Sequence, residues 1–275
     1  MSAKRSLAPI GIFDSGVGGL SVLREIRKQL PQENLIFLGD QEHVPYGPRP
    51  LQQVRDFSET ITRFLLNQGA KLIVVACNTA SAAALYYLRV TFPAVPFVGM
   101  EPAVKPAAEQ TQSGVVGVLA TPATFQGELY ASVVERFANG VTVLQDTCSG
   151  LVEQIEKGEL DSPATREILE RTLAPMLKKG IDRVVMGCTH YPFVIPLIQE
   201  IVGSQVQVID PAPAVARQVG RILTERGLLN TVDVPGRVRY LTSSDPEKLS
   251  NLLRSLIGEQ SPVDLVNWRV GKLEL

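Results

Sequence analysis

Cys77 and Cys188 stand in similar surroundings and are the residues best suited to chemistry. Each follows a short apolar run typical of a buried strand, and each is followed by polar residues instead of core residues. A single cysteine after a strand is more often a core residue, so the duplication carries the argument. A thiolate and a thiol on opposite sides of one carbon could take a proton from one face and return one to the other. Cys148 lacks this context and is interpreted as structural.

Neighbouring residues could support such a proton transfer. Free cysteine has a pKa near 8.5, so a thiolate must be favoured locally. Both cysteines precede an expected helix start, where backbone N–H groups favour anions. Asp14 and His190 are candidates to assist the transfer. Small donors suited to binding a substrate carboxylate are Asn78, Thr79, Thr121 and Thr189.

Each supporting residue also has an ordinary structural interpretation. Asp14 alone is typical of a turn or helix cap, and His190 alone of a half-buried, satisfied histidine. Tyr46 lies in a proline-flanked loop and would be a packed ring unless the loop faces the site. Glu153 and Glu156 lie on a short expected helix, where exposed acids are the default.

The elements that must position these residues alternate between apolar runs and helical spacing. The expected strands are 10–13, 35–38, 72–76, 95–98, 115–119, 141–144, 184–186 and 206–209. The expected helices between them are 20–30, 52–67, 81–89, 124–137, 165–179 and 196–202. This alternation predicts an α/β fold with mainly parallel sheets flanked by helices.

The two halves of the chain look like copies. Asp14 precedes Cys77 by nearly the same interval as Thr121 precedes Cys188. We therefore predict two similar domains related by a pseudo-twofold, with the active site in the cleft between them and one cysteine on each wall. The predicted first domain is 1–98 plus 211–275 and the second is 99–210. In the tail we expect helices at 214–226 and 247–256 and a strand at 237–242.

Composition excludes several classes of protein. The 275 residues are 45% hydrophobic and 20% charged, with a formal net charge of −1, so no basic surface indicates nucleic acid or an anionic membrane. Three widely spaced cysteines do not form a disulfide framework. No signal-peptide run or membrane-length apolar stretch is present, so we expect a cytoplasmic protein.

Other readings of the motifs remain open at this stage. The glycine-rich segment 16–19 follows a strand, and Asp40 lies where a dinucleotide-binding enzyme would hold a ribose. However, Ser21 replaces the third glycine of that motif, and Asp14 would repel a pyrophosphate. The glycines are better explained as letting a helix start approach a small ligand.

Three further alternatives use the cysteines differently. A zinc site would need more closely spaced ligands than Cys188 and His190 provide. A cysteine hydrolase would leave Cys77 unexplained. A cytoplasmic small-ligand binding protein with two α/β domains fits the architecture equally well, but it would not need twin thiols.

Five segments together carry a family resemblance, and it extends over about residues 10–223. They are the segments 13–19 (FDSGVGG), 45–47 (PYG), 76–80 (ACNTA), 121–124 (TPAT) and 187–192 (GCTHYP). In this combination the chain resembles the bacterial glutamate racemases of the aspartate/glutamate racemase family. The resemblance implies interconversion of L- and D-glutamate without a cofactor or metal, supplying D-glutamate for peptidoglycan, cell-wall biogenesis and cell shape. Aspartate racemase, a relative with the same two-thiol logic, is the alternative.

The resemblance also implies roles for residues. Cys77 matches the base that takes the proton from D-glutamate, and Cys188 its counterpart for L-glutamate. Asp14 and His190 match auxiliary acid/base positions, and Glu156 matches a further acidic catalytic position. The positions that match substrate-binding residues are Asp14, Ser15, Tyr46, Gly47, Asn78, Thr79, Thr121, Thr189 and His190. The partner implied is the small-molecule substrate, with a homodimer as the assembly that the family often forms.

Overall fold

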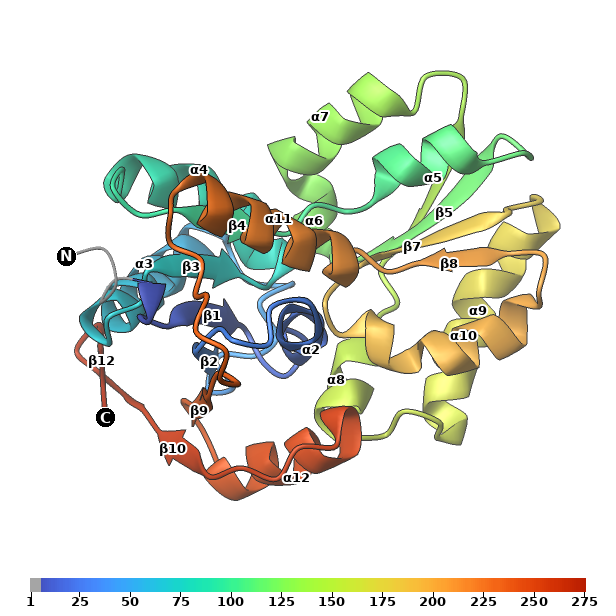
Figure 1. Ribbon diagram of the computed structural model, residues 1–275. Coiled ribbons are helices and arrows are strands. Elements are labelled where there is room, and N and C mark those ends of the chain that lie inside the picture. The colour runs from blue at the N-terminus through green and yellow to red at the C-terminus, as the bar shows by residue number, and fades with distance from the viewer. Residues whose placement is uncertain (1–5) are drawn as a thin grey trace.

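Two parallel β-sheets form the centres of two α/β domains in the computed structural model, which describes residues 6–275 (Figure 1). The first sheet contains β1 (Ile10–Asp14), β2 (Leu35–Gly39), β3 (Leu72–Val75), β4 (Phe97–Gly99), β9 (Val238–Thr242) and β10 (Val263–Leu265). The second contains β5 (Val115–Ala120), β6 (Thr142–Asp146), β7 (Arg183–Gly187) and β8 (Gln207–Ile209). The predicted α/β class with parallel sheets is confirmed.

The strand order repeats from one sheet to the other. The first sheet runs β10-β9-β2-β1-β3-β4 and the second β6-β5-β7-β8, so the order second-first-third-fourth occurs in both. Cys77 follows β3 and Cys188 follows β7, which are corresponding strands of the two sheets. Since the carboxyl ends of parallel strands lie at one edge of a sheet, each cysteine is placed at the edge where ligands bind in such folds.

Helices cover the faces of both sheets. Those packed with the first sheet are α2 (Leu20–Gln29), α3 (Leu51–Asn67), α4 (Asn78–Thr91), α11 (Ala212–Glu225) and α12 (Pro246–Ile257). Those of the second sheet are α5 (Val104–Gln110), α6 (Pro122–Gln126), α7 (Glu128–Phe137), α8 (Leu151–Glu156), α9 (Pro163–Lys178), the 3-10 helix η1 (Tyr191–Val194) and α10 (Ile195–Val202). Helix α2 shows why its sequence is helical: Leu20, Leu23 and Ile26 are spaced to share one buried face.

Two expectations about helices need correction. The predicted helix at 124–137 is divided into α6 and α7 at Gly127, whose backbone is extended. A side chain at Gly127 would lie 2.8 Å from the Cβ of Ala82, so the break lets α4 come close. The predicted helix at 81–89 begins earlier, at Asn78, with Cys77 as its N-cap.

The C-terminal segment extends the first sheet. Strand β9 pairs in parallel with β2, and β10 pairs with β9. The antiparallel hairpin of β11 (Asn267–Arg269) and β12 (Lys272–Glu274) was not predicted, and it packs against α3. The domain boundaries at 98, 99, 210 and 211 stay a prediction, and the first five residues of the predicted first domain lie outside the described residues.

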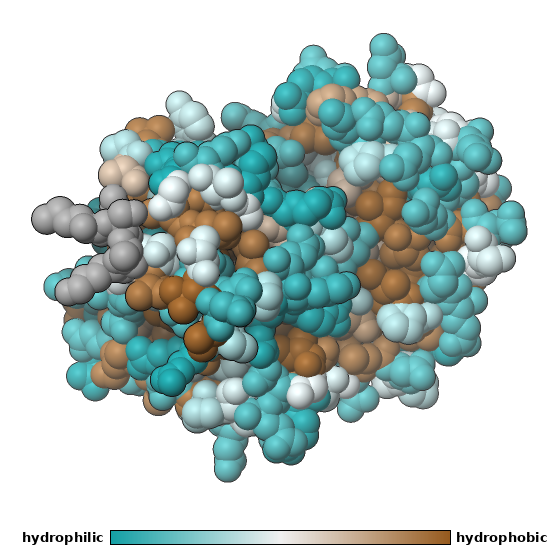
Figure 2. Space-filling model, viewed as in Figure 1, coloured by the Kyte–Doolittle hydropathy of each residue, from teal (hydrophilic) through white to brown (hydrophobic). Residues whose placement is uncertain are grey.

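Apolar packing joins the two domains. One cluster of buried side chains contains Ile10 and Leu20 of the first domain together with Leu169 and Val184 of the second. On the face in Figure 2, hydrophilic residues cover most of the surface and hydrophobic residues show through in patches. Within residues 6–275, none of the helices has both the length and the apolar character needed to cross a bilayer.

Candidate functional site

A small pocket lies where the carboxyl ends of the two sheets face each other. The first domain contributes predicted site residues Ser15, Tyr46, Gly47, Cys77, Asn78 and Thr79 to its wall. The second contributes Thr121, Cys188, Thr189 and His190. The structure thus brings both thiols to one pocket, one from each domain, and both are at most 5% exposed.

The Cys77 side of the pocket is built at the start of a helix. Cys77 caps α4, and its sulfur accepts a hydrogen bond from the Ala80 N–H at 3.4 Å. Its thiol lies 3.9 Å from Ser15 Oγ, and the Ser15 hydroxyl points to Asp14 Oδ1 at 3.5 Å. Burial and the negative charge of Asp14 raise the pKa of Cys77 well above its ordinary value, which the Ala80 N–H only partly offsets.

Asp14, at the end of β1, is fully buried behind the pocket. Its Oδ2 accepts from the Gly19 N–H at 2.6 Å, and the Thr189 hydroxyl reaches the same oxygen at 3.4 Å. Burial raises the pKa of Asp14, although the positive charge of His190 acts in the opposite direction. A carboxyl with a raised pKa can carry or accept a proton near Cys77.

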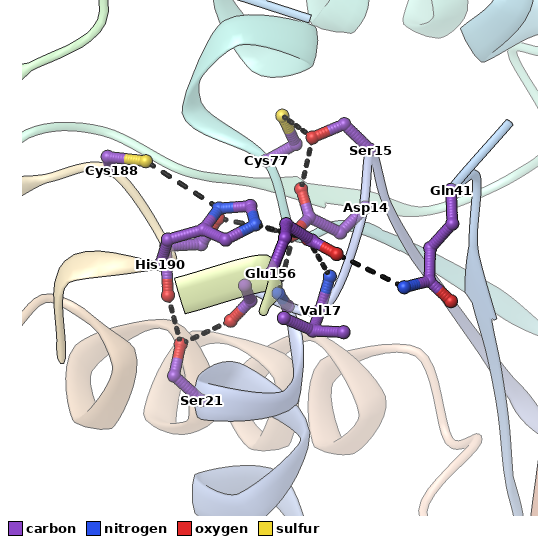
Figure 3. A network of polar contacts seen from close by, with 12 residues as sticks. Asp14, Ser15, Val17, Ser21, Gln41, Cys77, Glu156, Cys188 and His190 are labelled. Carbon is purple, nitrogen blue, oxygen red and sulfur yellow. Dashed lines mark hydrogen bonds and ion pairs between the residues drawn. The ribbon is translucent and has the colours of Figure 1, made fainter. Parts of the chain in front are cut away.

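The Cys188 side is built differently. Cys188 is followed by the four-residue η1 only from Tyr191, so the expected helix start directly after this cysteine is absent. Its partner is a side chain: Sγ lies 3.8 Å from His190 Nδ1, and His190 Nε2 lies 2.7 Å from Glu156 Oε1 (Figure 3). Cys188, His190 and Glu156 thus form a chain of contacts that leads from the pocket into the protein.

The charges along this chain of contacts support one another. Burial disfavours a charged imidazole, but the adjoining Cys188 and Glu156 outweigh it and raise the pKa of His190 well above its ordinary value. Burial likewise opposes the Glu156 carboxylate, yet the hydrogen bond and charge of His190 lower the pKa of Glu156. An imidazolium at His190 would stabilise a thiolate at Cys188 by charge.

Glu156 corrects the default interpretation of this helix. Glu153 is exposed, as expected for a surface acid, but Glu156 is only 5% exposed and points into the domain interface. Its Oε1 also accepts from the Val17 N–H at 2.7 Å, and its Oε2 accepts from Gln41 Nε2 at 3.1 Å. Glu156 thereby joins the second domain to two segments of the first.

Gly16 and Gly18 make room for side chains of the other domain, whereas Gly19 packs against residues of its own domain. A Cβ at Gly16 would lie 1.9 Å from Glu156 Oε1. A Cβ at Gly18 would lie 2.5 Å from His190 Nδ1, 2.7 Å from Thr189 Oγ1 and 2.8 Å from Asp14 Oδ2. Any side chain at Gly18 would therefore displace groups on both sides of the site.

The far wall of the pocket carries hydroxyl and amide groups. Thr79 Oγ1 and Thr121 Oγ1 are 2.8 Å apart, and Gly47 packs directly on Thr121, since a Cβ there would lie 3.0 Å from the Thr121 Cβ. Asn78 is 3% exposed. Within the described part of the chain, neither polar atom of its side chain has a hydrogen-bond partner. A buried, unpaired amide that faces a pocket is suited to a polar ligand.

The carboxylate of Asp40 already accepts hydrogen bonds from other residues of the protein. It accepts from Tyr46 Oη at 2.6 Å, Ser243 Oγ at 2.7 Å and Trp268 Nε1 at 2.8 Å, and His43 Nδ1 lies 3.0 Å away. These donors hold Tyr46 against the pocket and use the lone pairs that a ribose would need. The interpretation of Asp40 as a ribose-binding acid is not supported.

Several residues at the site were missed from sequence. Pro45 and Val152 line the pocket, and Gln41 contacts Glu156. Gln41 is the second residue after the buried strand β2, just as Cys77 is the second residue after β3, so the signal that identified Cys77 could have found it. Val152 has no distinguishing signal. Among residues 6–275, no three or more His, Cys, Asp or Glu side chains are grouped so as to hold a metal ion.

The fold and site together define a two-domain α/β protein with paired thiols in an interdomain pocket. The profile of the Asp/Glu/hydantoin racemase family matches residues 10–219. A glutamate racemase from Roseiflexus is 52% identical over 253 residues, covering 92% of this chain and 93% of the relative. The chain belongs to the Asp/Glu/hydantoin racemase family.

Solved structures agree with this assignment. A glutamate racemase isoform from Bacillus anthracis superposes with a TM-score of 0.85 at 31% identity, covering 96% of this chain and 98% of that one. A glutamate racemase from Francisella tularensis, crystallised in complex with D-glutamate, gives a TM-score of 0.82 at 30% identity, covering 95% and 98% of the two chains.

Proposed function

We propose that this protein is a glutamate racemase that moves the α-proton between Cys77 and Cys188 without a cofactor. The observation that carries the proposal is the presence of both thiols, one from each domain, at a single pocket. Family membership and the names of the relatives support an isomerase that acts on an amino acid, with glutamate as the substrate.

The reaction consists of two proton transfers. With D-glutamate bound, the Cys77 thiolate takes the α-proton, and the electron pair of the C–H bond stays on the α-carbon. The Cys188 thiol then donates its proton to the opposite face, giving L-glutamate and a Cys188 thiolate. The reverse direction begins from that thiolate, so the two directions start from opposite protonation states of the pair.

The remaining groups have supporting roles in this proposal. Ser15 and Asp14 lie behind Cys77, whereas His190 and Glu156 lie behind Cys188. Asn78, Thr79, Thr121 and Thr189 supply donors for the substrate carboxylates, and Tyr46 and Gly47 shape the wall. The implied role in the cell is the supply of D-glutamate for peptidoglycan.

The test is incubation in deuterated water with L-glutamate, D-glutamate, L-aspartate and L-alanine, followed by chiral chromatography and mass spectrometry. We expect glutamate alone to racemise, with one deuterium entering at the α-carbon of the inverted product. Racemisation of aspartate instead would favour the alternative substrate. Binding of glutamate without exchange or inversion would favour a binding protein.

The cysteines are tested by matched substitutions. We expect Cys77→Ser and Cys188→Ser each to slow racemisation by at least about a hundredfold, the usual contribution of a general acid or base. Cys148→Ala is the control, because Cys148 is also buried, in the core cluster that contains Cys188, but lies outside this pocket. Near-normal turnover in both serine variants would refute the roles assigned to the two thiols.

A further inference from the structure

Gln41 lies between Glu156 and the C-terminal strand β9, and hydrogen bonds on both sides hold its side-chain amide. It is the second residue after β2 and is 8% exposed. Its Oε1 accepts from the Thr242 hydroxyl at 2.9 Å, and Thr242 Oγ1 in turn accepts from the Ser244 N–H at 3.1 Å. These bonds set the orientation of the amide, so that Nε2 can only be the atom facing Glu156.

The carboxylate of Glu156 is fully engaged as a result. One oxygen takes the Val17 N–H and the His190 ring, and the other takes Gln41 Nε2. The contacts run from Thr242 through Gln41, Glu156 and His190 to Cys188, and Figure 3 shows Gln41 and His190 on opposite sides of Glu156. No equivalent contact of Gln41 reaches Cys77 among the hydrogen bonds of the described residues.

We propose that Gln41 is a positioning residue for the Cys188 half of the reaction, holding the Glu156 carboxylate so that it supports His190 beside Cys188. This inference rests on the proposed racemase function. Without the amide, one oxygen of Glu156 would be buried without a donor, which favours its protonation or displacement. Either change weakens the imidazolium and therefore destabilises a thiolate at Cys188.

The one-sided position of Gln41 has a kinetic signature. Enantiomers have equal free energies in water, so kcat/KM is the same in both directions whatever the enzyme. A substitution that affects only the Cys188 side must therefore change KM and kcat for one enantiomer, relative to the other, by the same factor. The complex with L-glutamate contains the Cys188 thiolate, whereas the complex with D-glutamate contains the Cys188 thiol. Destabilising that thiolate raises KM for L-glutamate relative to KM for D-glutamate.

The experiment measures KM and kcat for both enantiomers in the wild type, Gln41→Leu and Thr242→Val. We expect Gln41→Leu to raise the ratio of KM for L-glutamate to KM for D-glutamate about tenfold, as for loss of one hydrogen bond to a charged group. Thr242→Val, which frees the amide without removing it, should change the ratio in the same direction by less. Gln145→Leu is the matched control, because the Gln145 amide donates to Tyr130 Oη and neither residue lines the pocket. Its ratio should equal that of the wild type.

A second readout separates this inference from the proposed function. The chain has only two histidines, so the NMR signals of His190 need only be distinguished from those of His43, and its titration can be followed directly. We expect the His190 midpoint to fall in Gln41→Leu, whether or not glutamate is racemised. Equal changes of KM for both enantiomers, or an unchanged His190 midpoint, would overturn the role of Gln41. If Gln41→Leu fails to fold, the same two measurements on Thr242→Val decide. A wild type that racemises no glutamate would overturn the proposed function.

Discussion

The two thiols differ in the charge that accompanies each of them. Cys77 has the Asp14 carboxyl behind it, and the Ala80 N–H at the start of α4 offsets in part the resulting rise in the pKa of this thiol. Cys188 has His190 beside it, and contacts with Cys188 and Glu156 raise the pKa of that imidazole well above its ordinary value. A proton exchanged between them thus moves between unlike sites, and the support each one needs comes from a different part of the chain. Because of this difference, we expect a residue that supports only the Cys188 side, as proposed for Gln41, to change KM for the two enantiomers unequally.

At the residue scale, we expect the Asn78 side chain to lower the stability of the ligand-free protein and to contribute to ligand binding. Its buried amide has no partner within residues 6–275, and such a group costs about 1–3 kcal/mol. We therefore expect Asn78→Leu to stabilise the ligand-free protein by about 1 kcal/mol. The same change should abolish the stabilisation that D-glutamate gives, which for the wild type is about 2.7 kcal/mol at a hundred times Kd. Thermal unfolding with and without D-glutamate measures both effects.

Thr62→Val provides the matched control for this prediction. Thr62 Oγ1 is also buried without a partner in the described structure, but it lies on α3 outside the pocket. Its substitution should raise the unfolding temperature and leave the response to D-glutamate intact. If Asn78→Leu retained the full ligand response, the amide would have no part in binding.

At the scale of elements, the turn from β1 to α2 serves as a docking surface between domains. We expect Gly18→Ala to reduce racemisation about a hundredfold, because the new methyl group would displace His190, Thr189 or Asp14, and misplacements near 1 Å have effects of this size. Steady-state kinetics and circular dichroism measure activity and folding together. Gly220→Ala is the control and should leave activity unchanged. A Cβ at this helical glycine would lie 3.3 Å from Leu30 Cδ2, the end of a flexible side chain. Full activity in Gly18→Ala would contradict the tight fit at this turn.

The same turn shows what sequence could and could not reveal. Apolar runs bounded by turns identified every strand of the two sheets except β10, and the polar residues after β3 and β7 identified both thiols. Those signals are local. The partner of a glycine is not local, and residues 16–19 were assigned to a ligand because nothing nearby in sequence indicates Glu156. Burial of Glu156 depends on the docking of two domains, so its helix alone suggested an exposed acid.

At the scale of the whole molecule, the active site is also a junction between domains. One apolar cluster extends through both domains, and the polar contacts of Glu156 with Val17 and Gln41 cross the same boundary. The hydroxyl of Ser21 reaches Thr189 O at 3.0 Å across it as well. Since the thiols are nearly excluded from solvent, the pocket must open for a substrate to enter. The residues that hold the Cys188 side in place are thus also residues that hold the two domains together.

This coupling predicts how stability depends on pH. His190 faces Cys188, Glu156 and Asp14, and its pKa in the folded protein lies above its ordinary value of 6.5. Its contribution to the free energy of unfolding is therefore complete below pH 6.5 and is lost as the pH rises through the folded pKa. The folded pKa of Glu156 lies below 4.5, so its contribution is complete above pH 4.5 and is lost as the pH falls through the folded value. The pair therefore stabilises the protein most between these two ordinary values.

We expect Glu156→Gln to cost about 3 kcal/mol of unfolding free energy in that window, as for breaking a buried ion pair, and progressively less in alkaline solution. Urea unfolding of both proteins across the pH range gives the difference curve, in which any cost of the amide itself is constant. A flat curve would mean that the junction does not depend on charge, because only ionised partners give the difference a pH dependence.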